Sequence, residues 1–342
     1  MYISYKMVEN AVFFKGLDMV FVKRLVVALV LFALLCGGLS AQNVTDVYLN
    51  GDDLNNKIRS YSNNIISLIP DTTTLQNVWS VAPDGSFYFG VGVNGSFAFT
   101  DRTQVSNIAT GLEAFGADNV DVTQFPDSVP FLPAVTFDAR IGFGNYDFGL
   151  AGTWIDETTL EEAELNIFGK GSTFAMQSLG LDIRYSINKP LSLPKILPII
   201  ALQGGYYFTR TTFGIHAEDT GKTESVKVDF RNDTLLLGVH VSKGLMLNTI
   251  VPYAGIRVFF STTHSDYEWA TNRPVMTNGR LFYNGARYKS PTILDDTEVS
   301  SQFYAGLGIN FITYSLTIGG AYNLDTEHFS VNFSFRYYLG AL

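Results

Sequence analysis

The feature that most constrains this chain is a strict two-residue alternation of side-chain character. From Phe87 to Phe99 every odd position is apolar or glycine, whereas the even positions are small or polar. Successive side chains of a β-strand point to opposite faces, so this period predicts a strand with one apolar face. The run is longer than an ordinary globular strand of about 5–6 residues and suits a tilted membrane strand of about 9–11 residues with an extension.

The same pattern recurs along the chain and predicts about ten strands. They lie near 86–100, 134–143, 146–155, 173–187, 197–212, 223–242, 250–262, 299–311, 314–324 and 328–339. The Gly144-Asn145 pair is a two-residue hairpin turn, which places Phe143 and Tyr146 on one face. Eight, twelve or fourteen strands remain open, because 270–298 could hold a further hairpin.

The connections between these strands alternate in length. Short ones fall at 144–145, 188–196, 243–249 and 312–313, and long ones at 101–133, 156–172 and 263–298. Short turns at one end, long loops at the other and an even strand number are typical of a transmembrane antiparallel up-and-down β-barrel, here over 86–342. A soluble β-sandwich or barrel also has alternating strands. Aromatic residues near the strand ends, as in interfacial girdles, favour the membrane barrel.

The first 41 residues contain the three parts of a secretory signal peptide in their usual sequence. Lys23 and Arg24 precede an apolar run over 25–36, and small residues follow up to Ala41. The run is too short to span a bilayer, which needs roughly 20 apolar residues. We therefore expect export to a bacterial outer membrane, with lipid around the barrel and both termini in the periplasm.

Between the signal peptide and the first strand, the segment 42–85 contains one helical pattern. Apolar side chains fall at helical spacing, at Leu54, Ile58, Tyr61, Ile65, Leu68 and Ile69. Asp52 or Asp53 can cap the helix, and Pro70 is expected to end it. A short helix over 52–70 could plug the lumen, or lie in the periplasm as a lid or on the membrane surface.

Composition and motifs exclude several classes of function. The net charge of −9 disfavours a nucleic-acid partner. Gly90, Gly92 and Gly95 spell G-x-G-x-x-G, but they lie inside a strand and open no helix, so we expect them to make room for side chains. The spacing of histidines and other potential ligands in the sequence predicts no metal site and no cofactor site. We expect no enzyme, the alternative being a lipid-modifying barrel that uses His264 or His328, although no G-x-S-x-G motif accompanies them.

Charged residues on the inward face are the candidate functional residues. They are Asp138, Arg140, Asp147, Asp182, Arg184, Arg257 and Arg336. Buried charges need partners, so one interpretation is a structural ladder of ion pairs across neighbouring strands, and the other is a solute filter. Across the Gly144-Asn145 turn Asp147 lies diagonal to Arg140, which predicts that these two pair.

Two stretches carry a family resemblance, namely 193–206 and the sequence Pro252-Tyr253-Ala254-Gly255. They resemble an uncharacterised outer-membrane barrel family of Bacteroidota and spirochaetes, which implies fold and location but no activity. More distantly the chain is similar to OmpW-like and FadL-like barrels, which pass small hydrophobic compounds through the wall. This resemblance implies a channel or binding protein for small hydrophobic or weakly polar solutes. We expect the helical segment 52–70 to act as its gate. The alternative is a structural or surface-interaction barrel whose loops 101–133 and 263–298 meet external partners.

Overall fold

The computed structural model describes nearly all of the predicted strands and a few short segments before the first of them. The described residues are 49–50, 55–56, 69–74, 78–80, 85–101, 128–155, 172–188, 190–194, 196–219, 222–272, 274–278, 280–282, 286–289 and 293–340. The predicted signal peptide over 1–41 and most of the predicted helix over 52–70 lie outside them. Within the described part, no helix is long and apolar enough to cross a membrane.

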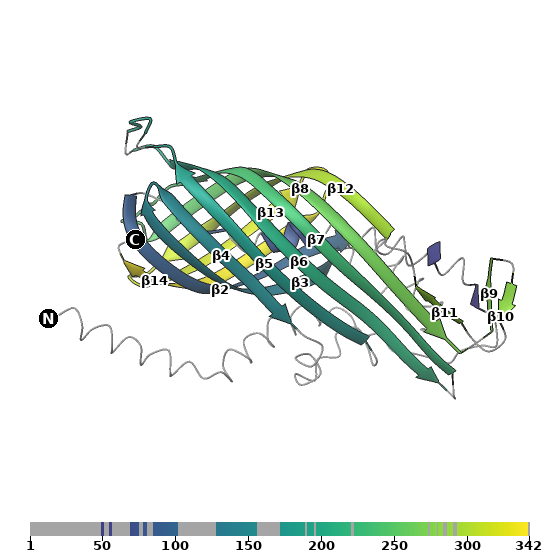
Figure 1. Cartoon of the computed structure of the whole chain (residues 1–342). Coiled ribbons are helices and arrows are strands. Elements are labelled where there is room, and N and C mark those ends of the chain that lie inside the picture. The colour runs from purple at the N-terminus through teal and green to yellow at the C-terminus, as the bar shows by residue number, and fades with distance from the viewer. Residues whose placement is uncertain are drawn as a thin grey trace.

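Ten long antiparallel strands form a closed barrel (Figure 1). They are β2 (Gly85–Asp101), β3 (Ser128–Gly144), β4 (Tyr146–Ile155), β5 (Ser172–Ser186), β6 (Ile199–Asp219), β7 (Lys222–Ser242), β8 (Ile250–Thr271), β12 (Ile293–Asn310), β13 (Tyr314–Asn323) and β14 (Phe329–Gly340). Each pairs with the next of these strands, and β14 pairs with β2, where Phe329 faces Phe99. The predicted ten-stranded antiparallel barrel is confirmed.

Two connections predicted as long loops are partly strand. β3 already begins at Ser128, β8 continues to Thr271 and β12 begins at Ile293, so the predicted loops 101–133 and 263–298 are too long. On β8 and β12 the reason is that polar residues enter the extensions, so the apolar alternation disappears. On β3 the extension is a continuous run of apolar residues and prolines, which shows no alternation either. A further hairpin does lie within 270–298.

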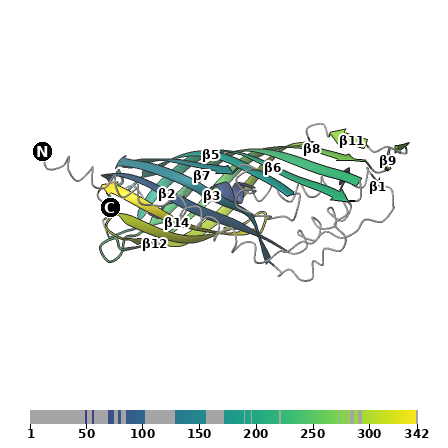
Figure 2. The same ribbon diagram turned by 90° about the horizontal axis from the view of Figure 1, so that it is seen from below.

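That hairpin adds no strand to the barrel wall. Its strands β9 (Val275–Thr277) and β10 (Arg280–Phe282) form a separate small sheet, in which β1 (Leu49–Asn50) pairs with β9 in parallel. The short β11 (Ala286–Lys289) extends the main sheet beside β8. These elements lie at one end of the barrel, which we call the loop end, and the short turns lie at the opposite turn end (Figure 2).

The two faces of the wall have opposite character. Large apolar side chains point outward and are exposed, such as Phe87 at 62%, Trp154 at 72% and Leu237 at 51%. Small polar side chains such as Asn94 and Ser96 point inward and are fully buried. A barrel in water would place its apolar face inside, so the outer surface of this barrel can leave water only by contact with lipid.

Two glycines of the G-x-G-x-x-G sequence serve packing on opposite sides of β2. A Cβ on Gly90 would lie 2.6 Å from the ring of Trp79, so glycine here admits a bulky side chain into the lumen. Gly95 faces outward, where a Cβ would lie 2.4 Å from the ring of Phe333 on β14. The expectation that these glycines make room for side chains is confirmed.

Candidate functional site

Residues from before the first barrel strand occupy the interior. A helical turn over 69–74 and the residues 78–80 are buried, and we call these nine residues the plug. In the turn, the Thr73 hydroxyl donates to the Ile69 carbonyl at 2.8 Å and the Thr74 hydroxyl to the Pro70 carbonyl at 2.6 Å. Figure 2 shows the coiled ribbon of this turn between strands on both sides.

Pro70 does not end a helix here. It lies at the second residue of the turn, so the expectation that it terminates a helix is wrong. Proline fits a helix where its missing N–H group costs no intrahelical hydrogen bond, and the carbonyl of Pro70 accepts a bond from the Thr74 hydroxyl.

Wall side chains on three strands bind the plug through its carbonyl oxygens. Ser96 on β2 donates to the Thr72 carbonyl at 3.1 Å. Arg257 on β8 donates to the Thr74 carbonyl at 2.8 Å. Arg184 on β5 donates to the Trp79 carbonyl at 3.1 Å. The plug is thus anchored to several sides of the barrel by individual hydrogen bonds.

Asp71 provides the charged contact of the plug. Its Oδ1 accepts a hydrogen bond from the Gln302 amide at 3.1 Å and another from the Asn323 amide at 2.8 Å. Its Oδ2 lies 3.4 Å from Nδ1 of His328. These partners lie on β12, on β13 and just before β14, so Asp71 ties the plug to a fourth region of the wall.

Trp79 fills the interior below this turn. The guanidinium of Arg140 lies 5.4 Å from its ring centroid and that of Arg336 lies 4.6 Å away, within cation–π range. Tyr338 packs edge-on against the same ring at 5.3 Å between centroids. The sequence analysis missed Asp71 and Trp79, and the one signal that could have pointed to Trp79 is the glycine at position 90 of an otherwise regular strand.

All seven predicted inward charges are buried inside the barrel, where four of them form one cluster. Asp147 is its centre and accepts hydrogen bonds from Arg140, from Arg184 at 2.7 and 3.0 Å, and from the Tyr88 hydroxyl at 2.6 Å. Asp182 accepts from Arg140 at 2.6 Å. The predicted pairing of Arg140 with Asp147 is confirmed.

The other three inward charges lie apart from this cluster. Asp138 pairs with Arg336 across β3, β2 and β14 at 2.7 Å. Arg257 instead donates to Oε1 of Gln302 at 2.9 Å and lies 4.9 Å from the ring centroid of Tyr304. The wall therefore presents two ion-paired groups and one arginine whose hydrogen bonds go to an amide and to the plug.

The segment before β2 enters the barrel from the loop end. Asn55 accepts hydrogen bonds from the Tyr267 hydroxyl at 3.2 Å and from the Trp269 indole at 2.9 Å, near the loop end of β8. β1 pairs with β9 at that same end, whereas Gly340 closes β14 at the turn end (Figure 2). The expectation that both termini lie in the periplasm concerns residues outside the described part of the chain and stays a prediction.

Comparison with known proteins concerns the fold. No protein-family model and no curated protein matches the chain, so the resemblance to a Bacteroidota and spirochaete family receives no support.

Solved outer-membrane barrels are similar at low identity. The outer-membrane protease OmpT of Escherichia coli has 11% identity and a TM-score of 0.34, covering 78% of this chain and 98% of OmpT. The translocator domain of the autotransporter NalP from Neisseria meningitidis has 9% identity and a TM-score of 0.35, covering 86% and 99%. The Pseudomonas putida toluene transporter TodX has 9% identity and a TM-score of 0.26, covering 78% and 91%. These scores are too low to transfer any function to this chain.

Proposed function

We propose that this chain is a bacterial outer-membrane channel for small polar or weakly polar solutes, closed by its own plug. The observation that carries the proposal is the plug itself, because residues 69–74 and 78–80 occupy the lumen and are bound by separate hydrogen bonds. Water could replace each of these bonds if the plug moved. The apolar outer surface supports the membrane location, which fractionation of cells and a heat-modifiability gel would test.

The lining of the lumen favours the weakly polar solutes over the hydrophobic ones. The inward face is rich in buried hydroxyl and amide side chains, including Thr136, Thr209, Asn232, Ser261 and Asn332. Among the wall side chains that the structure describes, four buried inward arginines stand against three buried inward aspartates, and Asp71 belongs to the plug. A lumen without its plug would therefore be polar and slightly positive, which suits neutral polar solutes and anions.

Conductance of the purified protein in planar bilayers tests the gate. We expect the full chain to conduct rarely, and a variant that lacks 43–80 to conduct steadily with a preference for anions. The deletion must reach residue 80, because a deletion that stopped at 70 would leave Asp71 and Trp79 in place. A heat-modifiability gel checks that the variant has folded.

A point variant probes the same gate with less disturbance. Asp71→Ala removes the acceptor for Gln302 and Asn323, so we expect longer open times than in the full chain. Asp266→Ala is the matched control, because that carboxylate lies on the outer face of β8. Equal conductance in the full chain, the deletion variant and Asp71→Ala would contradict the proposal.

The rival is a structural or surface-interaction barrel. A specific observation favours it, because bulky residues of the wall such as Tyr207, Tyr304 and Tyr338 are also buried inside. Ten strands enclose an interior somewhat wider than that of an eight-stranded barrel, which side chains fill. If the deletion variant folds and stays closed, the rival is correct, and the search for partners of the loop end becomes the next step.

A further inference from the structure

The outer face of β6, β7 and β8 changes character abruptly toward the loop end. On β8 the outward side chains are apolar up to Phe260, and from Thr262 onward they include His264, Asp266 and Glu268. The apolar outward row on β6 ends at Phe208, and that on β7 ends at Leu235. These three positions mark the edge of the apolar belt on this side of the barrel.

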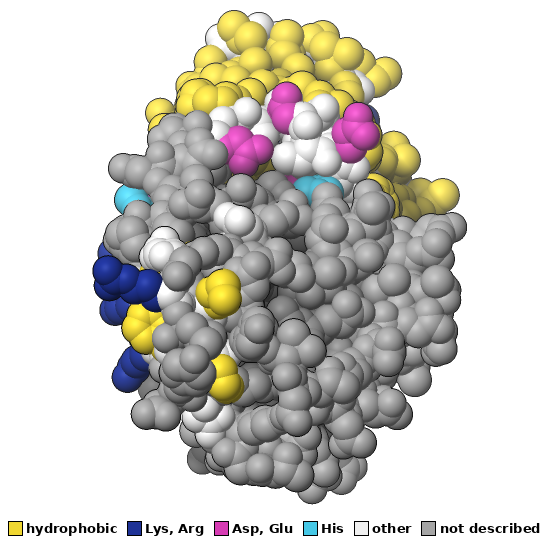
Figure 3. All heavy atoms as spheres, turned by 90° about the vertical axis from the view of Figure 1, so that its right-hand side faces the viewer, with side chains coloured by type: hydrophobic (Ala, Val, Ile, Leu, Met, Phe, Trp, Pro, Cys, Tyr) yellow, Lys and Arg dark blue, Asp and Glu magenta, His cyan; other side chains and the backbone are white. Residues whose placement is uncertain are grey.

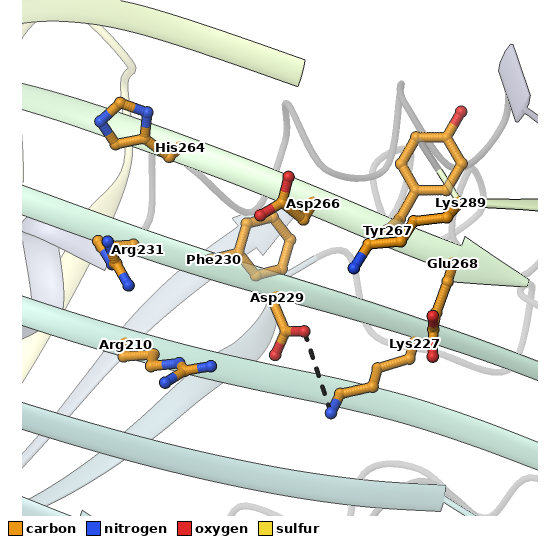
Figure 4. Close-up of a pocket in the computed structure, with 10 residues that line it drawn as sticks. All are labelled: Arg210, Lys227, Asp229, Phe230, Arg231, His264, Asp266, Tyr267, Glu268 and Lys289. Atoms are coloured by element: carbon orange, nitrogen blue, oxygen red, sulfur yellow. Dashed lines mark ion pairs between the residues drawn. The ribbon is translucent and has the colours of Figure 1, made fainter. Parts of the chain in front are cut away.

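The first basic residues beyond that edge stand in one row across the three strands. Arg210 on β6 faces Arg231 on β7, and Arg231 faces His264 on β8. Facing residues in neighbouring strands have Cβ atoms about 4.5–5.5 Å apart, and like charges in such positions are unfavourable. Figure 4 shows the three side chains side by side on successive strands. An anion between them would turn this repulsion into binding.

The height of the row matches the headgroup layer of a bilayer. Arg210 lies two residues beyond Phe208, and Arg231 lies four residues beyond Leu235. Two residues advance a strand by about 6.6 Å, which is about 5 Å of height at the tilt of 35–45° usual in such barrels. The two arginines therefore stand about 5–10 Å outside the apolar belt.

Two of the nearby carboxylates have partners other than the arginines. Asp233 accepts a hydrogen bond from the Tyr206 hydroxyl, and Asp229 accepts one from the Thr212 hydroxyl at 2.5 Å. Asp229 also lies 4.0 Å from Nζ of Lys227. Asp266 faces Asp229 in the next row outward, away from the membrane. Asp233, bound to Tyr206, therefore lies one outward position nearer the apolar belt than Arg231, and Asp229 and Asp266 lie one row farther out than the arginines.

A cavity of about 490 Å³ opens at this place. Its charged and titratable lining residues are Arg210, Arg231, His264, Lys227 and Lys289 together with the carboxylates Asp229, Asp266 and Glu268. The loop-end view in Figure 3 shows lysine and arginine side chains gathered on one flank of the molecule. The guanidinium group binds phosphate oxygens through two parallel N–H donors, and it is less strongly hydrated than an ammonium group.

We propose that the row of Arg210, Arg231 and His264 binds the phosphate group of a phosphorylated lipid in the surrounding leaflet. The inference rests on the membrane location of the barrel and is independent of the plug. A bound lipid would neutralise the facing arginines and hold its acyl chains against the apolar rows that end at Phe208 and Phe260.

A binding titration tests the site with the purified full chain in neutral detergent, followed by native mass spectrometry. The probes are phosphatidic acid, diacylglycerol with the same acyl chains, and inorganic phosphate. We expect the full chain to bind phosphatidic acid at least about tenfold more tightly than diacylglycerol, because charge-assisted hydrogen bonds to phosphate are involved. Arg210→Gln with Arg231→Gln should bring the two lipids to within about twofold of each other.

The matched control is Lys227→Gln with Lys289→Gln, which removes the same charge from positions farther out in the same cavity. This control should keep the preference for phosphatidic acid, and Arg231→Gln alone should lose part of it, even if the double arginine variant does not fold. The proposal is overturned if the full chain does not distinguish the two lipids, or if the lysine control loses as much as the arginine variant. Displacement of the lipid by inorganic phosphate at equal concentration would overturn it too, because the site would then take a free anion.

Discussion

At the residue scale, the period of the strands accounts for most of the interior that the sequence predicted. Period 2 assigns Arg140, Asp147 and Arg184 to the inward face, and the Gly144-Asn145 turn fixes the register that brings the first two together. The contact of Asp182 with Arg140 spans three strands and follows once the register of β5 is known. Trp79 could not be predicted, because it reaches these arginines from a segment outside the sheet.

Asp147 should be the most sensitive position of this cluster. Asp147→Asn leaves the buried guanidinium of Arg184 with a neutral partner and that of Arg140 with Asp182 as its remaining carboxylate, so we expect a loss of about 3–5 kcal/mol in the free energy of unfolding. Asp147→Asn together with Arg140→Gln should cost about 0.5–3 kcal/mol less than the two single losses added. Urea unfolding in lipid vesicles measures both, with Asp266→Asn on the outer face as a control near zero. Strict additivity would contradict the pairing.

At the element scale, the sequence predicted the strands best where they cross the apolar belt. Their turn-end limits agree with prediction to within a few residues, because apolar and polar residues alternate up to the turns. Their loop-end limits were missed on β3, β6, β8 and β12. On β8 the outward residues become polar there while Tyr267 and Trp269 stay buried inside, so the apolar outward row that marks the strand ends before the strand does. The residues that form the plug were not predicted for a different reason. Their contacts are with residues distant in sequence.

The direction of the segment before β2 leads to a prediction about labelling. If the loop end faces outward, as in barrels with short periplasmic turns, a cysteine at Asn56 should react with a membrane-impermeant maleimide on intact cells. Asn56 is exposed and follows Asn55, which binds to β8 at the loop end. Leu247→Cys, at a fully exposed turn-end position, should react only after the outer membrane is permeabilised. The reverse pattern would place the loop end in the periplasm.

At the scale of the whole molecule, the apolar belt and the polar extension of β6, β7 and β8 divide the outer surface into two zones. In the belt an outward side chain meets lipid, and beyond it the same face of the same strand meets water. β7 crosses both zones, with Leu237 in the belt and Ser225 near the loop end, and both positions point outward. A single strand therefore offers a direct comparison of the two environments.

The same substitution at these two positions of β7 should have very different costs. An arginine at a lipid-facing position near the midplane lowers the free energy of unfolding by about 2–4 kcal/mol. At a position exposed to water the loss is close to zero. We therefore expect Leu237→Arg to reduce the folded, heat-modifiable fraction strongly, and Ser225→Arg to leave it unchanged. Refolding into vesicles under graded urea gives both free energies on one scale. Equal tolerance at the two positions would mean that Leu237 does not face lipid, and the position assigned to the belt edge, with the phosphate-binding row just beyond it, would then be wrong as well.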